Sequence, residues 1–346
     1  MSWGHDFAGG TGEPNDPFRI ATAEQLTSIG SDPNLLSKHF VLVVDIDLDP
    51  NLPGGRVFDR AVIAPEASYT SVMVPQMGHF SGDFDGSGHS IRHLTIREGQ
   101  RFAVGLFGGI GASGQVRNLG VEQLSITRVV TNSVVGGLAG YNHGLVHRCH
   151  ATGTLSSDAQ AEAFGGLVGR SWEGRIAQCY ADCVLRAHRC MATGGLVGDN
   201  DGGEITMCYA SGIVDGVSVC GGLVARNSGR ISDCHASASI GPGGGLVAVN
   251  APGTIVRCYS IGRVPKVGAS AGLVATNGQV SADHHAIGSV VGCFWDTETS
   301  GITTSEGGTG LTTAQMMRQS SFAGWGFNNV WTIREGKDYP RLQWEQ

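Results

Sequence analysis

Short apolar segments recur along this chain, each placed just after a pair of small residues, usually two glycines. Five of them read GGLAG, GGLVG, GGLVG, GGLVA and GGLVA. With two more divergent copies, their leucines are Leu106, Leu138, Leu167, Leu196, Leu223, Leu246 and Leu273. Successive leucines are 32, 29, 29, 27, 23 and 27 residues apart. A repeat of this length predicts a solenoid, a propeller or another array in which each copy packs on the next.

Within each copy, small or apolar residues recur two positions apart, which is the period of a β-strand. A cysteine follows five of the seven leucines after 11 or 12 residues, Asn118 takes this position in the first copy, and a small residue comes two positions later. The cysteines are Cys149, Cys179, Cys208, Cys234 and Cys258, with His284 at the equivalent position of the last copy. Because neighbouring strands lie about 4.8 Å apart, these positions predict interior columns. Free cysteine is typical of protein cores, so we interpret the column as packing and not as disulfides.

An asparagine column accompanies the cysteines. Its members are Asn142, Asn200, Asn227, Asn250 and Asn277, with Ser171 in the second copy. Asparagine tolerates left-handed backbone and can bond to the same group one rung away. The column therefore predicts stacked turns of a β-helix.

The residue after each cysteine carries a ring and, by strand parity, points outward. This column consists of His150, Tyr180, Tyr209, His235, Tyr259 and His285. Flat rings with polar edges are suited to binding a sugar or a partner protein. The alternative is cross-strand stacking that only stiffens one face of the sheet.

The two ends of the chain depart from the repeat and are predicted to cover the terminal rungs, which every solenoid has to protect. Residues 1–60 contain a helix signal, since Thr22 and Gln25 form a capping box, followed by an alternating strand over residues 40–50. We assign residues 1–60 to an N-terminal cap, residues 61–292 to the β-helix and residues 293–346 to a C-terminal cap. Residues 51–79 are expected to form a long loop or insertion.

Charge and composition argue against some classes of partner and setting. The net charge is −7 and the basic residues are scattered, which argues against nucleic acid as a partner. No apolar run is long enough to span a membrane, and the first residues do not resemble a signal peptide. The nine cysteines are an odd number, so at least one thiol is unpaired. Oligomeric state is not specified by these features.

Acidic residues cluster in one part of the repeat and are the candidates for catalysis or metal binding. Asp199, Asp201 and Glu204 occupy one turn, while Glu173 and Asp182 lie one copy earlier. Paired carboxylates could serve a polysaccharide lyase or glycoside hydrolase, and the oxygens of the turn could hold Ca²⁺. The alternative is a solvated acidic turn without metal. No other cofactor is expected.

The repeated GGLVG-x-N…CY-A-x-G-x-V phrase resembles the GLUG motif. The segments DFDGSGHSIRHLTI, CFWDTETSG, GGTGLTTAQM and WTIREGKDYPRL resemble those that accompany it in bacterial surface and secreted proteins. The resemblance implies a right-handed parallel β-helix in an extracellular or cell-surface setting. GLUG repeats also accompany metallopeptidases, whose HExxH zinc motif is missing from this sequence.

These features together predict a non-catalytic module for adhesion, with a glycan or a surface protein as its partner. A polysaccharide-active enzyme is the alternative.

Overall fold

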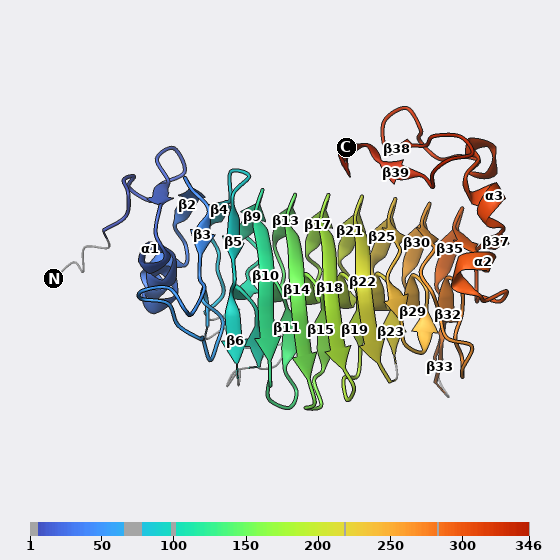
Figure 1. Cartoon of the computed structure of the whole chain (residues 1–346), viewed down its shortest axis with the longest axis horizontal. Coiled ribbons are helices and arrows are strands. Elements are labelled where there is room, and N and C mark those ends of the chain that lie inside the picture. The colour runs from blue at the N-terminus through green and yellow to red at the C-terminus, as the bar shows by residue number, and fades with distance from the viewer. Residues whose placement is uncertain (1–5, 66–77, 98–101, 218, 282–283, 346) are drawn as a thin grey trace.

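The protein is described by a computed structural model, which covers residues 6–65, 78–97, 102–217, 219–281 and 284–345, without the side chains of residues 279–286. The chain forms a parallel β-solenoid of about seven turns, with the strands of successive turns stacked along the long axis (Figure 1). The predicted all-β solenoid is therefore confirmed. A few short helices accompany the strands.

Each turn of the solenoid passes through four sheets, which we call A to D, and the strand pairs within them are parallel over the described residues. Sheet A contains β1 (Phe18–Ile20), β2 (His39–Leu42), β4 (Asp83–Asp85), β9 (Gln115–Arg117), β13 (Leu145–His147), β17 (Arg175–Ala177), β21 (Glu204–Thr206), β25 (Arg230–Ser232), β30 (Thr254–Val256) and β35 (Ser289–Val291). Sheet B contains β3 (Ile46–Asp47), β5 (Ser90–Arg92), β6 (Thr95–Arg97), β10 (Gly120–Thr127), β14 (His150–Ser157), β18 (Tyr180–Ala187), β22 (Tyr209–Gly216), β26 (His235–Ala236), β27 (Ser239–Ile240), β31 (Tyr259–Ser260), β36 (Phe294–Asp296) and β37 (Thr309–Leu311).

The other two sheets complete the turn between sheet B and the next strand of sheet A. Sheet C contains β7 (Ala103–Val104), β11 (Val134–Gly136), β15 (Ala163–Gly165), β19 (Thr193–Gly194), β23 (Cys220–Gly221) and β28 (Gly243–Gly244). Sheet D contains β8 (Phe107–Ile110), β12 (Ala139–Asn142), β16 (Val168–Trp172), β20 (Val197–Asp201), β24 (Val224–Asn227), β29 (Val247–Asn250) and β32 (Val274–Asn277).

The remaining elements lie at the ends of the coil or outside the four sheets. The helices are α1 (Ala23–Ser28), α2 (Thr297–Ser300) and α3 (Thr313–Met316), with short 3-10 helices η1 (Ile29–Ser31), η2 (Pro33–Leu35), η3 (Gln319–Ser321) and η4 (Gln343–Glu345). Two antiparallel pairs are formed by β33 (Gln279–Ser281) with β34 (His284–Ala286) and by β38 (Trp331–Thr332) with β39 (Arg341–Leu342).

The interior columns follow the predicted alternation. The cysteines are buried and unpaired, and the backbone N–H of each bonds to the sulfur of the next, as from Cys149 to Cys179 at 3.3 Å. Burial raises the pKa of both of these thiols, which leaves them protonated and unreactive. At the corner, a Cβ added to Gly195 would lie 2.1 Å from the carbonyl oxygen of Gly222, so the close approach of adjacent turns requires glycine there.

The asparagines form a buried ladder, as predicted. The Nδ2 of Asn200 donates to Oδ1 of Asn227 at 2.8 Å, and Asn227 repeats this contact with Asn250 at the same distance. Their backbone is not left-handed, however. The left-handed residue of each turn is instead the one before the cysteine, such as Arg148 (φ 53°) and Asp233 (φ 54°), at the corner between sheets A and B.

At the N-terminal end, α1 begins after Thr22, whose hydroxyl accepts from the N–H of Gln25, as the capping box predicts. The single strand predicted over residues 40–50 is divided into β2 and β3, which lie in different sheets. A corner at residues 43–45 separates them, because the chain turns here as it does in later rungs. Residues 66–77, within the predicted loop, lie outside the described residues.

The last turn differs from its prediction. His284 and His285 were expected to continue the cysteine and ring columns, but they belong to β34, which forms a hairpin with β33. Cys293 continues the cysteine column, since its sulfur accepts from the N–H of Cys258, and Phe294 pairs with Tyr259. The hairpin is an insertion of the last turn. The side chain of His285 lies outside the described residues.

Sheets A and B extend beyond the assigned β-helix boundaries of residues 61 and 292. Strands β1 and β2 already belong to sheet A, and β36 and β37 extend sheet B. After α3 the chain folds back along the coil, so that β38 and β39 lie over the rungs of β25 and β30 and the chain end reaches the rung of β21 (Figure 1). We call residues 317–345 the C-terminal strap.

Candidate binding surface

The outward rings of sheet B form one continuous stack, which we call the ring column. Adjacent ring centroids are 4.7 to 5.0 Å apart and adjacent planes lie within 7° of parallel. Its members are His150, Tyr180, Tyr209, His235 and Tyr259. In-register parallel pairing places each ring over the same position of the next strand, so the stack is a direct result of the repeat.

The C-terminal strap covers one end of the ring column. Trp331 is fully buried and its indole N–H donates to Asp233 at 3.2 Å, while its ring packs on Tyr259. The Tyr259 hydroxyl donates to the carbonyl of Pro340, and the imidazole of His235 lies 2.9 Å from the Glu345 carboxylate. His235 and Tyr259 are consequently only 7% and 2% exposed. This half of the column is a docking surface for the chain's own strap.

The other half of the column remains open at its edge. Trp344 is the last strap residue to touch it, with ring centroids 5.7 Å from Tyr209 and 6.4 Å from Tyr180, and its indole N–H is fixed on the carbonyl of Met207. His150 and Tyr180 lie beyond it and are partly exposed. We call His150, Tyr180 and Trp344 the ring platform.

Polar groups border the ring platform on the side away from Trp344. Glu122 accepts from the Ser90 hydroxyl at 2.7 Å, lies 3.1 Å from Nε2 of His150 and pairs with Arg92 at 3.1 Å. The hydrogen bond from Ser90 is the main reason that the pKa of Glu122 falls below its ordinary value. The platform therefore combines the open edges of stacked aromatic rings with a fixed carboxylate and a guanidinium.

The five predicted acidic residues are distributed over three sheets and one turn. Asp199 and Asp201 lie on β20, where Arg170 of the preceding rung approaches both, at 3.9 and 2.9 Å. Burial raises the pKa of Asp199 above its ordinary value. Glu204 pairs with Arg175 at 3.1 Å. Three of the five predicted carboxylates therefore lie beside an arginine.

The other two predicted carboxylates point elsewhere. Glu173 is an exposed turn residue, and Asp182 lies on β18 in sheet B, beside Thr152 and Ser211. Within the residues that the structure describes, no group of three or more His, Cys, Asp or Glu side chains is arranged to hold a metal ion.

A second group of rings lies on sheet D and was not predicted as a unit. His79 stacks on Tyr141 and tilts toward His143, and the ring of His143 stacks on Trp172. His79 is 6% exposed and neither of its ring nitrogens has a hydrogen-bond partner in the described structure. Burial lowers the pKa of His79 to about 4 and also lowers that of His143. No repeat spacing relates the four rings, because His79 precedes the repeats.

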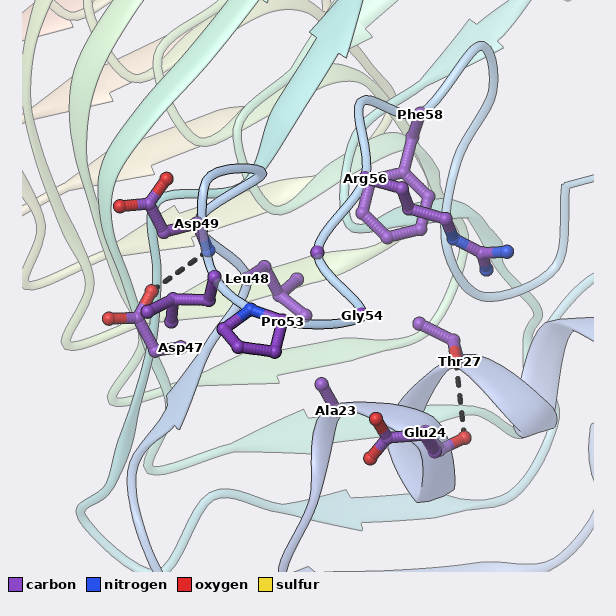
Figure 2. Close-up of a pocket in the computed structure, with 12 residues that line it drawn as sticks. Ala23, Glu24, Thr27, Asp47, Leu48, Asp49, Pro53, Gly54, Arg56 and Phe58 are labelled. Atoms are coloured by element: carbon purple, nitrogen blue, oxygen red, sulfur yellow. Dashed lines mark hydrogen bonds between the residues drawn. The ribbon is translucent and has the colours of Figure 1, made fainter.

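A hollow of about 210 Å³ lies at the N-terminal end, between α1 and residues 47–58 (Figure 2). Its acidic side chains already have contacts. Oδ1 of Asp47 accepts from the backbone N–H of Asp49 at 2.9 Å and lies 2.8 Å from Nδ1 of His93. We therefore do not place the binding surface at this hollow.

The repeats match a known sequence family. The model of the GLUG motif matches residues 131–156 and 190–215. The chain carries GLUG-motif repeats. The matched segments run from just before β11 into β14 and from just before β19 into β22, so each GLUG repeat is one turn of this coil.

Two relatives share the repeats. Halomucin of Haloquadratum walsbyi is 30% identical over 165 residues, which cover 47% of this chain and 2% of halomucin. A protein of Evansella cellulosilytica, provisionally described as a Gly-rich membrane protein, is 36% identical over 143 residues, 40% of this chain and 15% of its own length. The chain thus spans only a small part of the length of these relatives.

A solved structure has a similar fold. It is a Bacteroides ovatus protein described as a candidate immunoglobulin A1 protease, with a TM-score of 0.63, 21% identity, and coverage of 98% of this chain and 96% of that one. At this identity the likeness extends to the fold alone. Among the helices of the described residues, none combines the length and apolar character needed to cross a bilayer.

Proposed function

We propose that this chain is a non-catalytic β-solenoid module that acts outside the cell or at its surface and binds glycans through the ring platform. The observation that carries the proposal is the open end of the ring column, where His150 and Tyr180 stack at 4.7 Å beside Trp344. The names of the relatives, a mucin-like protein and a membrane protein, support a surface setting.

The chemistry of the platform suits a sugar better than an apolar peptide. The C–H groups of a pyranose can pack against the open edges of the aromatic rings, while its hydroxyls need polar partners at the rim. Glu122 and Arg92 provide an acceptor and a donor at that rim, and their mutual contact holds them in place. Successive rungs are about 4.8 Å apart, which is close to the length of one sugar unit. A polysaccharide chain can therefore lie along the stack.

The test is a glycan array probed with the parent chain, Tyr180→Ala and Trp344→Ala. Each variant removes one stacking ring, and we expect its affinity to fall about three- to tenfold. Phe102→Ala is the matched control, because Phe102 is an exposed ring, 54% accessible, outside the platform. Equal retention of all four proteins, or no retention of the parent, would refute glycan binding at the platform.

A surface protein as the partner, and a polysaccharide-active enzyme, remain the alternative predictions. The enzyme requires two carboxylates that act on one bond, whereas Asp199 and Asp201 share Arg170 as a counterion. Release of reducing ends or unsaturated products from a polysaccharide panel would establish the enzyme, and loss of that release in Asp201→Asn would place it at β20.

A further inference from the structure

A groove of about 570 Å³ lies at the ends of β6, β10, β14 and β18, on the same sheet as the ring platform. Arg97, Arg128, Arg186 and His188 line it, and Asp158 is the one carboxylate among the lining residues. We call it the basic groove. In a chain with a net charge of −7, three arginines facing one acid form a distinct cationic site.

The positions of the basic groove follow from the strand register. Arg97 pairs with Thr127, Thr127 with Ser156, and Ser156 with Arg186, so these four side chains form one outward column. The hydroxyls of Thr127 and Ser156 thus lie between the two arginines of the column. Arg97 and Arg186 are three rungs apart, which is about 14 Å at the ordinary strand spacing.

Arg97 and Arg186 of the basic groove differ from several arginines of the described chain that are paired with carboxylates. Arg92, Arg117, Arg170 and Arg257 are all held by carboxylates. In the described part of the chain, the side chains of Arg97, Arg186 and His188 have no ion pair or hydrogen bond, and all three are exposed. Their charge is therefore available to a ligand.

We propose that the basic groove binds an acidic polysaccharide, with carboxylate or sulfate groups on Arg97 and Arg186 and sugar hydroxyls on Thr127 and Ser156. The separation of the two arginines exceeds the size of a single phosphate or carboxylate ion, so the ligand is a chain that carries spaced charges along the coil axis. The guanidinium fork matches carboxylate and sulfate oxygens. Single-stranded nucleic acid fits less well, because it also requires stacking rings and the groove offers one imidazole.

The basic groove is separate from the ring platform. Ser156 lies six positions after His150 on β14, a distance of about 20 Å along the strand. The proposal rests on the proposed function only in the general class of ligand, which is a glycan. Mutations in one site and not in the other distinguish the two sites.

The experiment measures binding of the whole chain to immobilised polygalacturonate and chondroitin sulfate, with dextran and single-stranded DNA as comparators. Arg97→Gln and Arg186→Gln are each expected to weaken binding to the acidic glycans about five- to tenfold, through loss of a charge-assisted hydrogen bond. The double variant is expected to lose about 50-fold, and higher salt to weaken the parent. Arg230→Gln, an exposed arginine on sheet A, is the matched control with parental affinity.

The outcomes separate the two proposals. Weaker binding of the acidic glycans by the arginine variants, together with parental affinity in Tyr180→Ala, supports the basic groove. This holds even if the ring platform binds no glycan. Unchanged affinity in the double variant, dextran binding as tight as that of the acidic glycans, or tighter binding of DNA would overturn the proposal. Parental circular dichroism in the variants excludes misfolding as the cause, and failure of the parent to bind either acidic glycan also overturns it.

Discussion

The inward and outward columns of the same rungs behave differently along the coil. The asparagine ladder is buried at Asn142, Asn200, Asn227 and Asn250, and the cysteines are buried from Cys149 to Cys293. The ring column has equally regular stacking but passes from the open His150 to the fully covered Tyr259. The repeat therefore specifies the coil, and a segment without the repeat decides which part of its surface is available.

The largest expected loss of stability concerns the half of the ring column that the C-terminal strap covers. Trp331→Ala removes a fully buried indole that packs on Trp325 at 4.5 Å and on Tyr259 at 5.9 Å. We expect the docking of the strap to weaken by about 3–5 kcal/mol, the usual cost of deleting a buried aromatic side chain. Hydrogen exchange of residues 317–345 measures this, and the asparagine ladder should keep its protection.

The control for Trp331→Ala is Phe102→Ala, which deletes an exposed ring outside the strap. If the strap were an integral part of the coil, Trp331→Ala would instead lower protection in both regions together. That result would remove the distinction between the repeat and the segment that covers it.

The second prediction concerns the inward ladder. Asn227→Ala removes one of the two acceptors of the Asn200 amide and leaves Oδ1 of Asn250 without its donor, both inside the coil. Unsatisfied buried groups of this kind are expected to cost about 2–4 kcal/mol of unfolding free energy. Urea denaturation measures the loss.

Two variants sharpen the test of the ladder. Asn51→Ala removes an exposed amide that bonds only locally to Asp49, and we expect a change within about 0.5 kcal/mol. Asn227→Ser introduces the residue that naturally occupies the ladder at Ser171, where the hydroxyl accepts from Asn142 at 3.3 Å. Asn227→Ser should therefore lose less stability than Asn227→Ala, and equal losses would argue against the ladder as the cause.

The columns were predictable from the sequence because strand parity and a repeat length together fix which residues face inward. Cys149, Asn227 and Tyr180 all occupy the expected faces. The error at His285 arose because the last cysteine step, from Cys258 to Cys293, is 35 residues long and contains the hairpin of β33 and β34. A spacing of 27 residues between leucines gave no sign of that insertion.

The strap was not predictable from pattern, because its contacts are remote in sequence. Trp331 reaches Asp233 across 98 residues and Trp344 reaches Met207 across 137, without any periodicity that relates them. The same reason applies to the acidic turn. Nothing in the sequence near Asp201 reveals that Arg170 of the neighbouring rung neutralises it.

The smallest expected effect concerns a buried ring outside the repeat, and it depends on pH. The pKa of His79 is lowered from 6.5 to about 4, because burial disfavours the charged imidazole. The imidazole of His79 is therefore protonated near pH 6.5 in the unfolded chain, but only near pH 4 in the folded chain. Stability contributed by the neutral ring is thus present above pH 6.5 and is lost as pH falls through this window.

At about 1.4 kcal/mol per pH unit, the parent should lose about 2 kcal/mol more than His79→Phe between pH 7 and pH 5. Phenylalanine keeps the ring beside Tyr141 and His143 but does not titrate. Urea denaturation of both proteins at several pH values provides the measurement, and subtracting the two curves removes the carboxylates that titrate in both. Parallel curves would mean that His79 is protonated or solvated in the folded chain, and that the rings of sheet D are as open as the ring platform.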